Sequence, residues 1–335
     1  MEYQKILSDI QQKKIAPIYL LHGEEPFFID ILSKEIQKHT LEDHERDFNE
    51  SVVYGKDADI ASVLSFAKGY PMMAEKKLVI IREAQDVKDK DYDLIEKYIH
   101  NFNESSVFVF AFKYKKLDSR IRLYKLFKEK GIVYLSEKIR DYQLPSWINS
   151  YLKNKKYRIS EKAAVLLADF LGNDLSKIVN ELEKLQLLIP PQSEINESDI
   201  EKNIGISKDY NIFELNNAIL EKNIIKALKI VDYFAHNPKA ASILALIPTL
   251  YNSFSKLMKI HSNPHQSNEY YAQNFGGSPY QIKELRKSEM YYSPRKIAEN
   301  IAVLLEYDLK AKGVENVSFS ESDLMKEMVF KLIPL

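Results

Sequence analysis

The chain has 335 residues, which is too many for one compact core and predicts two or three domains. It has no cysteine, so disulfide frameworks and thiolate metal sites are excluded, and its longest apolar runs are far shorter than a membrane span. The 48 basic and 48 acidic residues balance, so overall charge does not draw the chain onto DNA, and any DNA contact must be local or made inside a complex.

The first part of the chain alternates short apolar runs with amphipathic stretches. The runs are rich in β-branched and aromatic residues and do not alternate with polar ones, as is typical of strands buried on both faces of a parallel sheet. They span residues 18–21, 52–54, 78–81, 107–112 and 132–135. Between them, apolar residues recur at helical spacing, for example at Phe28, Ile31 and Leu32. This alternation predicts a three-layer α/β domain with a parallel sheet over residues 1–138.

The rest of the chain is expected to be helical. From Leu144 onward we find apolar residues at helical spacing and expect no strand. Asp174 is placed to cap one helix, and Ser293 with the proline after it has the features of another helix start. We therefore expect a small helical domain over residues 139–207 and a second one over residues 208–335.

Gly23 follows the first predicted strand at the position where a phosphate-binding loop would begin. A working loop has the pattern G-x-x-x-x-G-K-[ST], because glycines let backbone N–H groups cradle phosphates, the lysine reaches the outer phosphates and the hydroxyl holds magnesium. In that register Phe28, Ile29 and Asp30 replace the second glycine, the lysine and the Ser/Thr. Glu24 adds negative charge where a phosphate needs positive charge. We expect no nucleotide at this degenerate loop.

The end of the third predicted strand supports the same expectation. In a P-loop enzyme this strand ends in an acidic pair that holds magnesium and orients water, whereas here Arg82 and Glu83 follow the apolar run. No histidine has the spacing of a metal ligand pair. Together these features predict a chain with no catalytic site, no cofactor and no metal ion. The alternative is that the domain is of another type and Gly23 is only a turn between strand and helix.

Seven segments carry a resemblance to a known family through their order and spacing. They are residues 16–25, 71–84, 116–120, 123–125, 144–148, 172–185 and 211–215, of which 172–185 (GNDLSKIVNELEKL) is the most distinctive. The chain resembles the delta subunit of the bacterial DNA polymerase III clamp loader over residues 14–260, and beyond them by helical character only. The resemblance implies an AAA+/P-loop NTPase-like domain, an all-α lid domain, and an all-α collar domain that joins a circular pentamer.

The resemblance also implies a function in DNA replication. Members of this family bind the beta sliding clamp, a ring-shaped protein, and open it at one interface so that it can be placed around primed DNA. Their ATP-binding partners, the tau/gamma and delta-prime subunits, hydrolyse the ATP. The chain would then belong to a DNA-directed DNA polymerase complex. It would work in the cytoplasm, at the replication fork on the nucleoid, and would not bind a membrane. The N-terminal residues agree with this location, since they lack the layout of a signal peptide.

The family contacts the clamp through two adjacent apolar side chains just before the third strand. In this sequence those positions are Met72 and Met73, and the usual leucine–phenylalanine pair is absent. Methionine is flexible and polarizable and can fill an apolar pocket, and Tyr70 and Pro71 are expected to shape the loop. On the residues alone, core packing over the sheet edge is the more common role for such a pair, whereas the resemblance favours the clamp contact.

A basic cluster follows the fourth predicted strand, with Tyr114 and Tyr124 interleaved. Its candidate DNA-facing residues are Lys113, Lys115, Lys116, Arg120 and Arg122. One interpretation is a surface that follows phosphates inside the pentamer. The other, slightly favoured, is a solvated helix face whose charge is partly compensated by Asp118 and Glu129.

Two other functions compete with the clamp-opening one. An active ATPase subunit of a clamp loader would need an intact phosphate loop and an acidic magnesium site, and neither is present. A helical DNA-binding regulator would need a basic net charge or a base-reading helix-turn-helix, and the neutral charge balance disfavours it.

Overall fold

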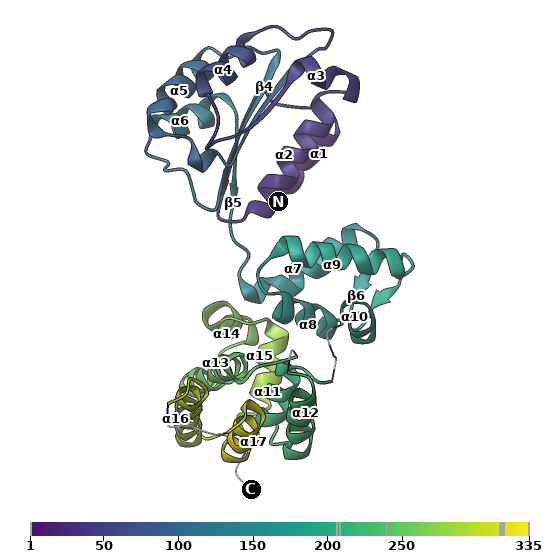
Figure 1. Cartoon of the computed structure of the whole chain (residues 1–335), viewed down its shortest axis with the longest axis vertical. Helices are drawn as coiled ribbons and strands as arrows, with labels where there is room; N and C mark the ends of the chain where they lie inside the picture. Colours follow the sequence, from purple (N-terminus) through teal and green to yellow (C-terminus); the bar gives the residue numbers. More distant parts are fainter. Residues whose placement is uncertain (1, 206, 208, 239, 315–318, 334–335) are drawn as a thin grey trace. The chain divides into compact units, whose positions relative to one another are not determined.

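The computed structural model describes residues 2–205, 207, 209–238, 240–314 and 319–333. It divides into two compact units, Met1–Ile139 and Arg140–Leu335 (Figure 1). The expected division of the second unit between residues 207 and 208 stays a prediction, because residue 208 lies outside the described part of the chain.

The first unit is built on a five-stranded sheet with the order β2-β3-β4-β1-β5. Its strands are β1 (Ile18–Gly23), β2 (Glu50–Tyr54), β3 (Lys77–Arg82), β4 (Ser106–Lys113) and β5 (Ile132–Ser136). Every neighbouring pair is parallel, and β1 and β4 are buried along their whole length. The five predicted strands and their parallel arrangement are therefore confirmed.

Two apolar cores lie on the two faces of the sheet. In β1, Ile18 and Leu20 belong to one core and Tyr19 and Leu21 to the other, because successive side chains of a strand point to opposite faces. One core is covered by α1 (Glu2–Gln11) and α2 (Pro26–Thr40), and the other by α4 (Ile60–Lys68), α5 (Tyr92–His100) and α6 (Arg122–Lys130) (Figure 1). The predicted three-layer α/β fold is confirmed.

Short elements complete the first unit at the ends of its strands. They are the 3-10 helices η1 (Asp43–Glu45), η2 (Ala84–Asp86) and η3 (Asp89–Asp91) and the one-turn helix α3 (Arg46–Asn49). Helix α3 runs directly into the edge strand β2, and η2 follows β3 after one residue.

The second unit is mainly helical. Its elements are η4 (Asp141–Gln143), α7 (Leu144–Asn154), α8 (Glu161–Leu171), α9 (Leu175–Leu188), α10 (Glu197–Ile204), α11 (Ile212–Leu220), α12 (Ile224–His236), α13 (Ile243–Ser262), α14 (Asn268–Phe275), α15 (Pro279–Arg286), α16 (Pro294–Ala311) and α17 (Glu321–Leu332). Helices α11 to α17 share one apolar core. None of the helices in the described part of the chain has the length and apolar character needed to cross a bilayer.

The predicted caps are confirmed at two of these helices. Asp174 Oδ1 accepts a hydrogen bond of 3.1 Å from the Lys177 N–H at the start of α9. Ser293 Oγ accepts one of 3.3 Å from the Lys296 N–H at the start of α16. Each cap satisfies an N–H that has no partner within its own helix.

The expectation that no strand follows Leu144 was wrong for two short segments. Strands β6 (Arg158–Ile159) and β7 (Glu194–Ile195) pair in parallel, and Ile159 and Ile195 are buried between helices. Two residues are too few to show a period, and their pairing joins segments far apart in the chain, so the local pattern carried no signal for it.

Candidate functional site

The degenerate phosphate loop is closed against strand β5. Gly23 has a φ of 142°, and a Cβ built on it would lie 2.0 Å from the carbonyl oxygen of Ser136, so only glycine fits there. The Glu25 N–H donates to that same carbonyl at 3.3 Å, and Ser136 Oγ donates to the Glu25 carbonyl at 2.7 Å. Backbone groups that a phosphate-binding loop would offer to a ligand are thus used within the chain.

The N-terminus of α2 is capped by a carboxylate of the chain itself. Buried Glu25 accepts a 3.1 Å hydrogen bond from the Phe27 N–H through Oε1. Pro26 occupies the first helical turn and has no N–H to offer. Because a helix N-terminus favours negative charge, the Glu25 carboxylate stands where a phosphate would be expected.

Two positions of the degenerate pattern are part of the apolar core. Ile29, at the lysine position, lies in α2 and is completely buried in the core between that helix and the sheet. Phe28, at the second glycine position, is half-buried and packs its ring against Tyr3 with 4.9 Å between the ring centroids. Glu24 is exposed. The lysine and glycine positions are therefore used for packing.

The third position of the pattern, Asp30, belongs to an ion network centred on Lys113, which we call the Lys113 triad (Lys113, Asp30 and Glu83). The Lys113 Nζ lies 2.6 Å from Asp30 Oδ1 and 2.9 Å from Glu83 Oε1. Gln85 supports it, since its Nε2 donates to Glu83 Oε2 at 2.6 Å and its Oε1 accepts from the Lys113 N–H at 2.9 Å. A side-chain ammonium thus lies between two carboxylates at the carboxyl ends of β3 and β4, beside the start of α2.

The electrostatics of the triad favour the charged forms of Lys113 and Glu83. Burial alone would lower the pKa of Lys113, but hydrogen bonds and charges from Asp30 and Glu83 raise it above its ordinary value. Burial alone would raise the pKa of Glu83, but hydrogen bonds from Lys113 and Gln85 and the Lys113 charge hold it below its ordinary value. The ammonium compensates one of the two carboxylate charges, and all the bonds of the triad are made within the chain.

The predicted DNA-facing role of Lys113 is therefore wrong. Its side chain is only 8% exposed, and its ammonium is already shared by two carboxylates. The sequence placed it in the basic cluster because it directly precedes Tyr114 and Lys115, but strand β4 ends at Lys113 and directs its side chain inward. The inward direction of the Lys113 side chain is apparent only from its contacts with Asp30 of α2 and with Glu83, which follows β3.

The other four basic residues are on the surface. Lys116 pairs with Glu137 at 3.1 Å, Arg120 with Asp118 at 2.7 Å and Arg122 with Glu96 at 3.5 Å, while Lys115 is exposed beside the Phe112 ring. Exposed ion pairs of this kind contribute little to stability and are screened by salt. The arrangement is that of a solvated, partly compensated face, and a DNA contact by these four residues stays a prediction.

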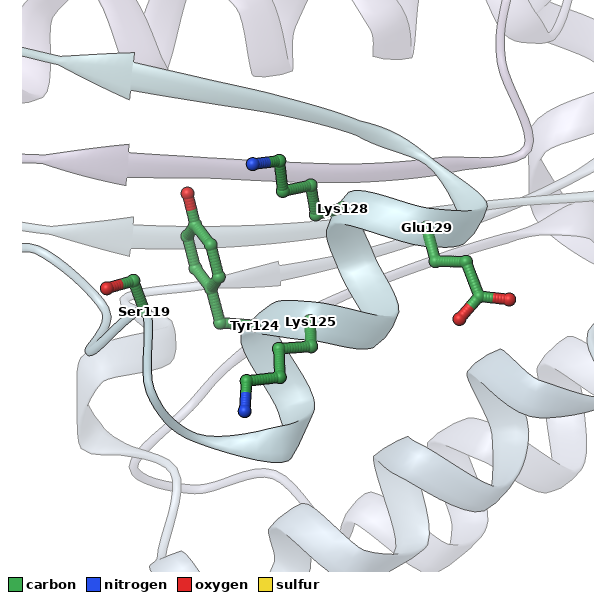
Figure 2. A pocket seen from close by; sticks show the side chains of 5 residues that line it. All are labelled: Ser119, Tyr124, Lys125, Lys128 and Glu129. Carbon is green, nitrogen blue, oxygen red and sulfur yellow. The ribbon is translucent and has the colours of Figure 1, made fainter.

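A shallow pocket lies next to this face on α6. It is lined by Ser119, Tyr124, Lys125, Lys128 and Glu129 (Figure 2). Figure 2 shows the ammonium groups of Lys125 and Lys128 pointing in different directions, with the Glu129 carboxylate turned away from Tyr124. The pocket does not direct its charges at one point, so it has no marks of a built ligand site.

The methionine loop, residues 69–76 between α4 and β3, exposes its apolar side chains. Met73 is 100% exposed, Met72 60% and Tyr70 83%, while Pro71 is half-buried. These exposures exclude the core-packing interpretation of Met72 and Met73. Met73 also has a φ of 54°, a left-handed conformation that is uncommon for a residue with a side chain.

The elements that flank this loop, the end of α4 and the start of β3, are held by hydrogen bonds. Lys77 Nζ donates to the Phe66 carbonyl at 3.2 Å, and Ser106 Oγ donates to the Ala67 carbonyl at 2.6 Å. In the middle, the buried side chain of Asn49 hydrogen-bonds the backbone of Met72. Asn49 and Gln85 were not predicted from the sequence, because no motif marks a residue whose partner lies more than twenty positions away.

Comparisons with known proteins place the chain among replication proteins. A family model described as DNA polymerase III, delta subunit matches residues 19–136, and one described as DNA polymerase III delta subunit, C-terminal domain matches residues 209–325. The DNA polymerase III subunit delta of Bacillus subtilis is 25% identical over 319 residues, which cover 91% of each chain. The solved structure of the Bacillus subtilis DNA clamp loader delta protein shares the fold, with a TM-score of 0.60 and 21% identity over 99% of both chains.

Proposed function

We propose that this chain, which belongs to the family of DNA polymerase III delta subunits, binds the beta sliding clamp through Met72 and Met73 and opens the ring without hydrolysing ATP. The observation that carries the proposal is the methionine loop itself. Two adjacent methionine side chains are exposed on a loop whose Met72 backbone is hydrogen-bonded by Asn49, and the Lys77–Phe66 hydrogen bond joins the residues that flank the loop.

Exposed apolar side chains on an ordered loop are typical of protein–protein binding sites. Apolar side chains at 60% and 100% exposure gain free energy when a partner's pocket removes them from water. Interfaces depend on a few such anchors near their centre, and a loop that is already ordered loses little entropy on binding. Tyr70 and Pro71 flank the anchors and would complete the contact.

The residues that fill the degenerate phosphate loop support the proposal that the chain does not hydrolyse ATP. The Glu25 cap, the core position of Ile29 and the Lys113 triad fill three places where a P-loop would bind phosphate or magnesium. We therefore propose that the chain has no catalytic site and needs no cofactor, although it belongs to a DNA polymerase complex. The alternative of an ATPase subunit has no support in these residues.

The chain would act as a mechanical part of a larger assembly. Its helical domains, proposed as a lid over residues 139–207 and a collar over residues 208–335, would join the tau/gamma and delta-prime subunits, which bind and hydrolyse ATP. Clamp binding near one interface of the ring would then hold that interface apart while primed DNA enters. The assembly would work in the cytoplasm, at the replication fork on the nucleoid.

Calorimetric titration of the purified chain with the sliding clamp of the same organism tests the contact. We expect the Met72→Ala/Met73→Ala variant to bind at least about a hundredfold more weakly, because both anchors are lost. Met290→Ala is the matched control, since Met290 is 80% exposed but lies in the second unit. It should bind as the wild type does.

The outcomes separate the two parts of the proposal. If the wild type does not bind the clamp, the proposed function is wrong. If the double variant remains folded and binds with unchanged affinity, the chain binds the clamp elsewhere and Met72 and Met73 are not the contact.

A further inference from the structure

The backbone of Met72 is held by one side chain that is distant in the sequence. The Met72 N–H donates to Asn49 Oδ1 at 2.7 Å, and Asn49 Nδ2 donates to the Met72 carbonyl at 2.9 Å. A paired N–H and C=O on one residue are what a neighbouring β-strand would bind. Asn49 therefore supplies to Met72 the two bonds of a strand partner.

The oxygen and both N–H groups of the Asn49 carboxamide form hydrogen bonds. Its second amide hydrogen goes to the Glu45 carbonyl at 2.9 Å, and the residue is 0% exposed. Asparagine is one of the two side chains that carry an amide donor and a carbonyl acceptor together, so aspartate and leucine, although similar in size, cannot make this set of bonds. Removing the side chain would take away the hydrogen-bond partner of the Met72 N–H and of the Met72 and Glu45 carbonyls.

The position of Asn49 in the fold explains why it reaches the loop. Asn49 is the last residue of α3 and directly precedes the edge strand β2, where Glu50 lies opposite Leu78 of β3. The methionine loop enters β3 at that same end of the sheet. Within the described residues, no backbone–backbone hydrogen bond involves residues 70–76, so side chains hold the loop.

We infer that Asn49 is a positioning residue that holds the methionine loop in its binding-competent form before the partner arrives. This inference rests on the proposed function, because it gives Asn49 a role in clamp binding through Met72. With the Met72 backbone fixed and Met73 turned into the left-handed region, both side chains are held outward in one arrangement. A pre-ordered contact binds more tightly because less conformational entropy is lost on association.

The test combines clamp titration with hydrogen exchange on the full-length chain. For Asn49→Ala we expect clamp affinity to fall about tenfold, less than for the loss of both methionines, since the anchors remain but are no longer held. We also expect the Met72 amide to exchange faster, while the amides of β3 and β4 keep their protection. The exchange measurement reports on the loop without the clamp, so a general loss of structure would be recognised.

Asn300→Ala is the matched control. Asn300 is also 0% exposed and donates to the Leu332 carbonyl at 3.2 Å, but it lies in the second unit. This variant should leave both clamp affinity and Met72 exchange unchanged. If Asn49→Ala does not fold, Asn49→Asp serves instead, because it keeps the size and the acceptor for the Met72 N–H while its second oxygen cannot donate to the Met72 and Glu45 carbonyls.

Each outcome bears on the inference. Weaker binding together with faster Met72 exchange supports it. Wild-type affinity in a folded Asn49→Ala variant, or an unchanged Met72 exchange rate, overturns it. If the wild-type chain itself does not bind the clamp, the proposed function fails first and the positioning role falls with it, which the wild-type titration shows separately.

Discussion

The Lys113 triad puts a side-chain ammonium between two carboxylates at the strand ends where a P-loop enzyme would hold magnesium. The sequence alone shows the substitutions that disable the phosphate loop, because they fall at fixed positions of a known pattern. It does not show what takes the place of the ligand. That depends on Lys113, Asp30 and Glu83 meeting from three separate segments, and the charge pattern around Lys113 suggested a surface role instead.

Removing the Lys113 ammonium should destabilise the first unit. We expect Lys113→Met to lower the free energy of unfolding by about 2 kcal/mol, because Asp30 and Glu83 lose the cation between them. The exposure of Asp30, at 45%, keeps the loss below that of a fully buried pair. Hydrogen exchange of the β4 amides as a function of urea measures the change.

The exposed neighbour Lys115 provides the control for this prediction. Lys115→Met should change the same free energy by less than about 0.5 kcal/mol, since surface substitutions rarely do more. A Lys113→Met variant as stable as the wild type would mean that the triad does not hold α2 to the strand ends.

At the scale of elements, features encoded by neighbouring residues could be predicted, whereas contacts between distant segments could not. The strands and the helix starts at Asp174 and Ser293 were predicted correctly, because apolar runs and caps are encoded within a few residues. The β6–β7 pair and the Asn49 anchor were missed, because each joins segments more than twenty residues apart and leaves no periodic signal.

One hydrogen bond between distant segments, from the residues after β4 to β1, predicts that the stability of the fold depends on pH. The Nδ1 atom of buried His22 accepts a 3.0 Å hydrogen bond from the Leu117 N–H, and burial, with a contribution from the Lys116 charge, lowers the pKa of His22 from 6.5 to about 4. His22 binds a proton more readily in the unfolded chain than in the folded one. The neutral His22 and its hydrogen bond therefore stabilise the fold fully above pH 6.5. That stability is lost as the pH falls from 6.5 to about 4, by about 3 kcal/mol in all.

The variant His22→Gln checks this pH dependence. Gln keeps an acceptor for the Leu117 N–H but does not titrate. We expect unfolding measured between pH 7 and pH 4 to show a shallower loss of stability in the variant, by the His22 contribution. Equal slopes for the two proteins would show that His22 is not the titrating group.

At the scale of the whole molecule, the methionine loop and the degenerate phosphate loop are both held by residues of the chain itself. The methionine loop is held at Met72 by Asn49, and the degenerate phosphate loop is held by Glu25, Ser136 and the Lys113 triad. The proposed function gives a nucleotide no role in either loop. The chain should therefore open the clamp by binding alone, with ATP needed only by its partners.

Release of a clamp from closed circular DNA tests this claim most directly, because a closed ring cannot leave a closed circle unless one of its interfaces opens. We predict that the purified chain releases the clamp without any nucleotide, that added ATP does not change the rate, and that Met72→Ala/Met73→Ala loses the activity while Met290→Ala keeps it. Binding without release, or release that requires ATP, would show that the chain does not open the clamp by binding alone.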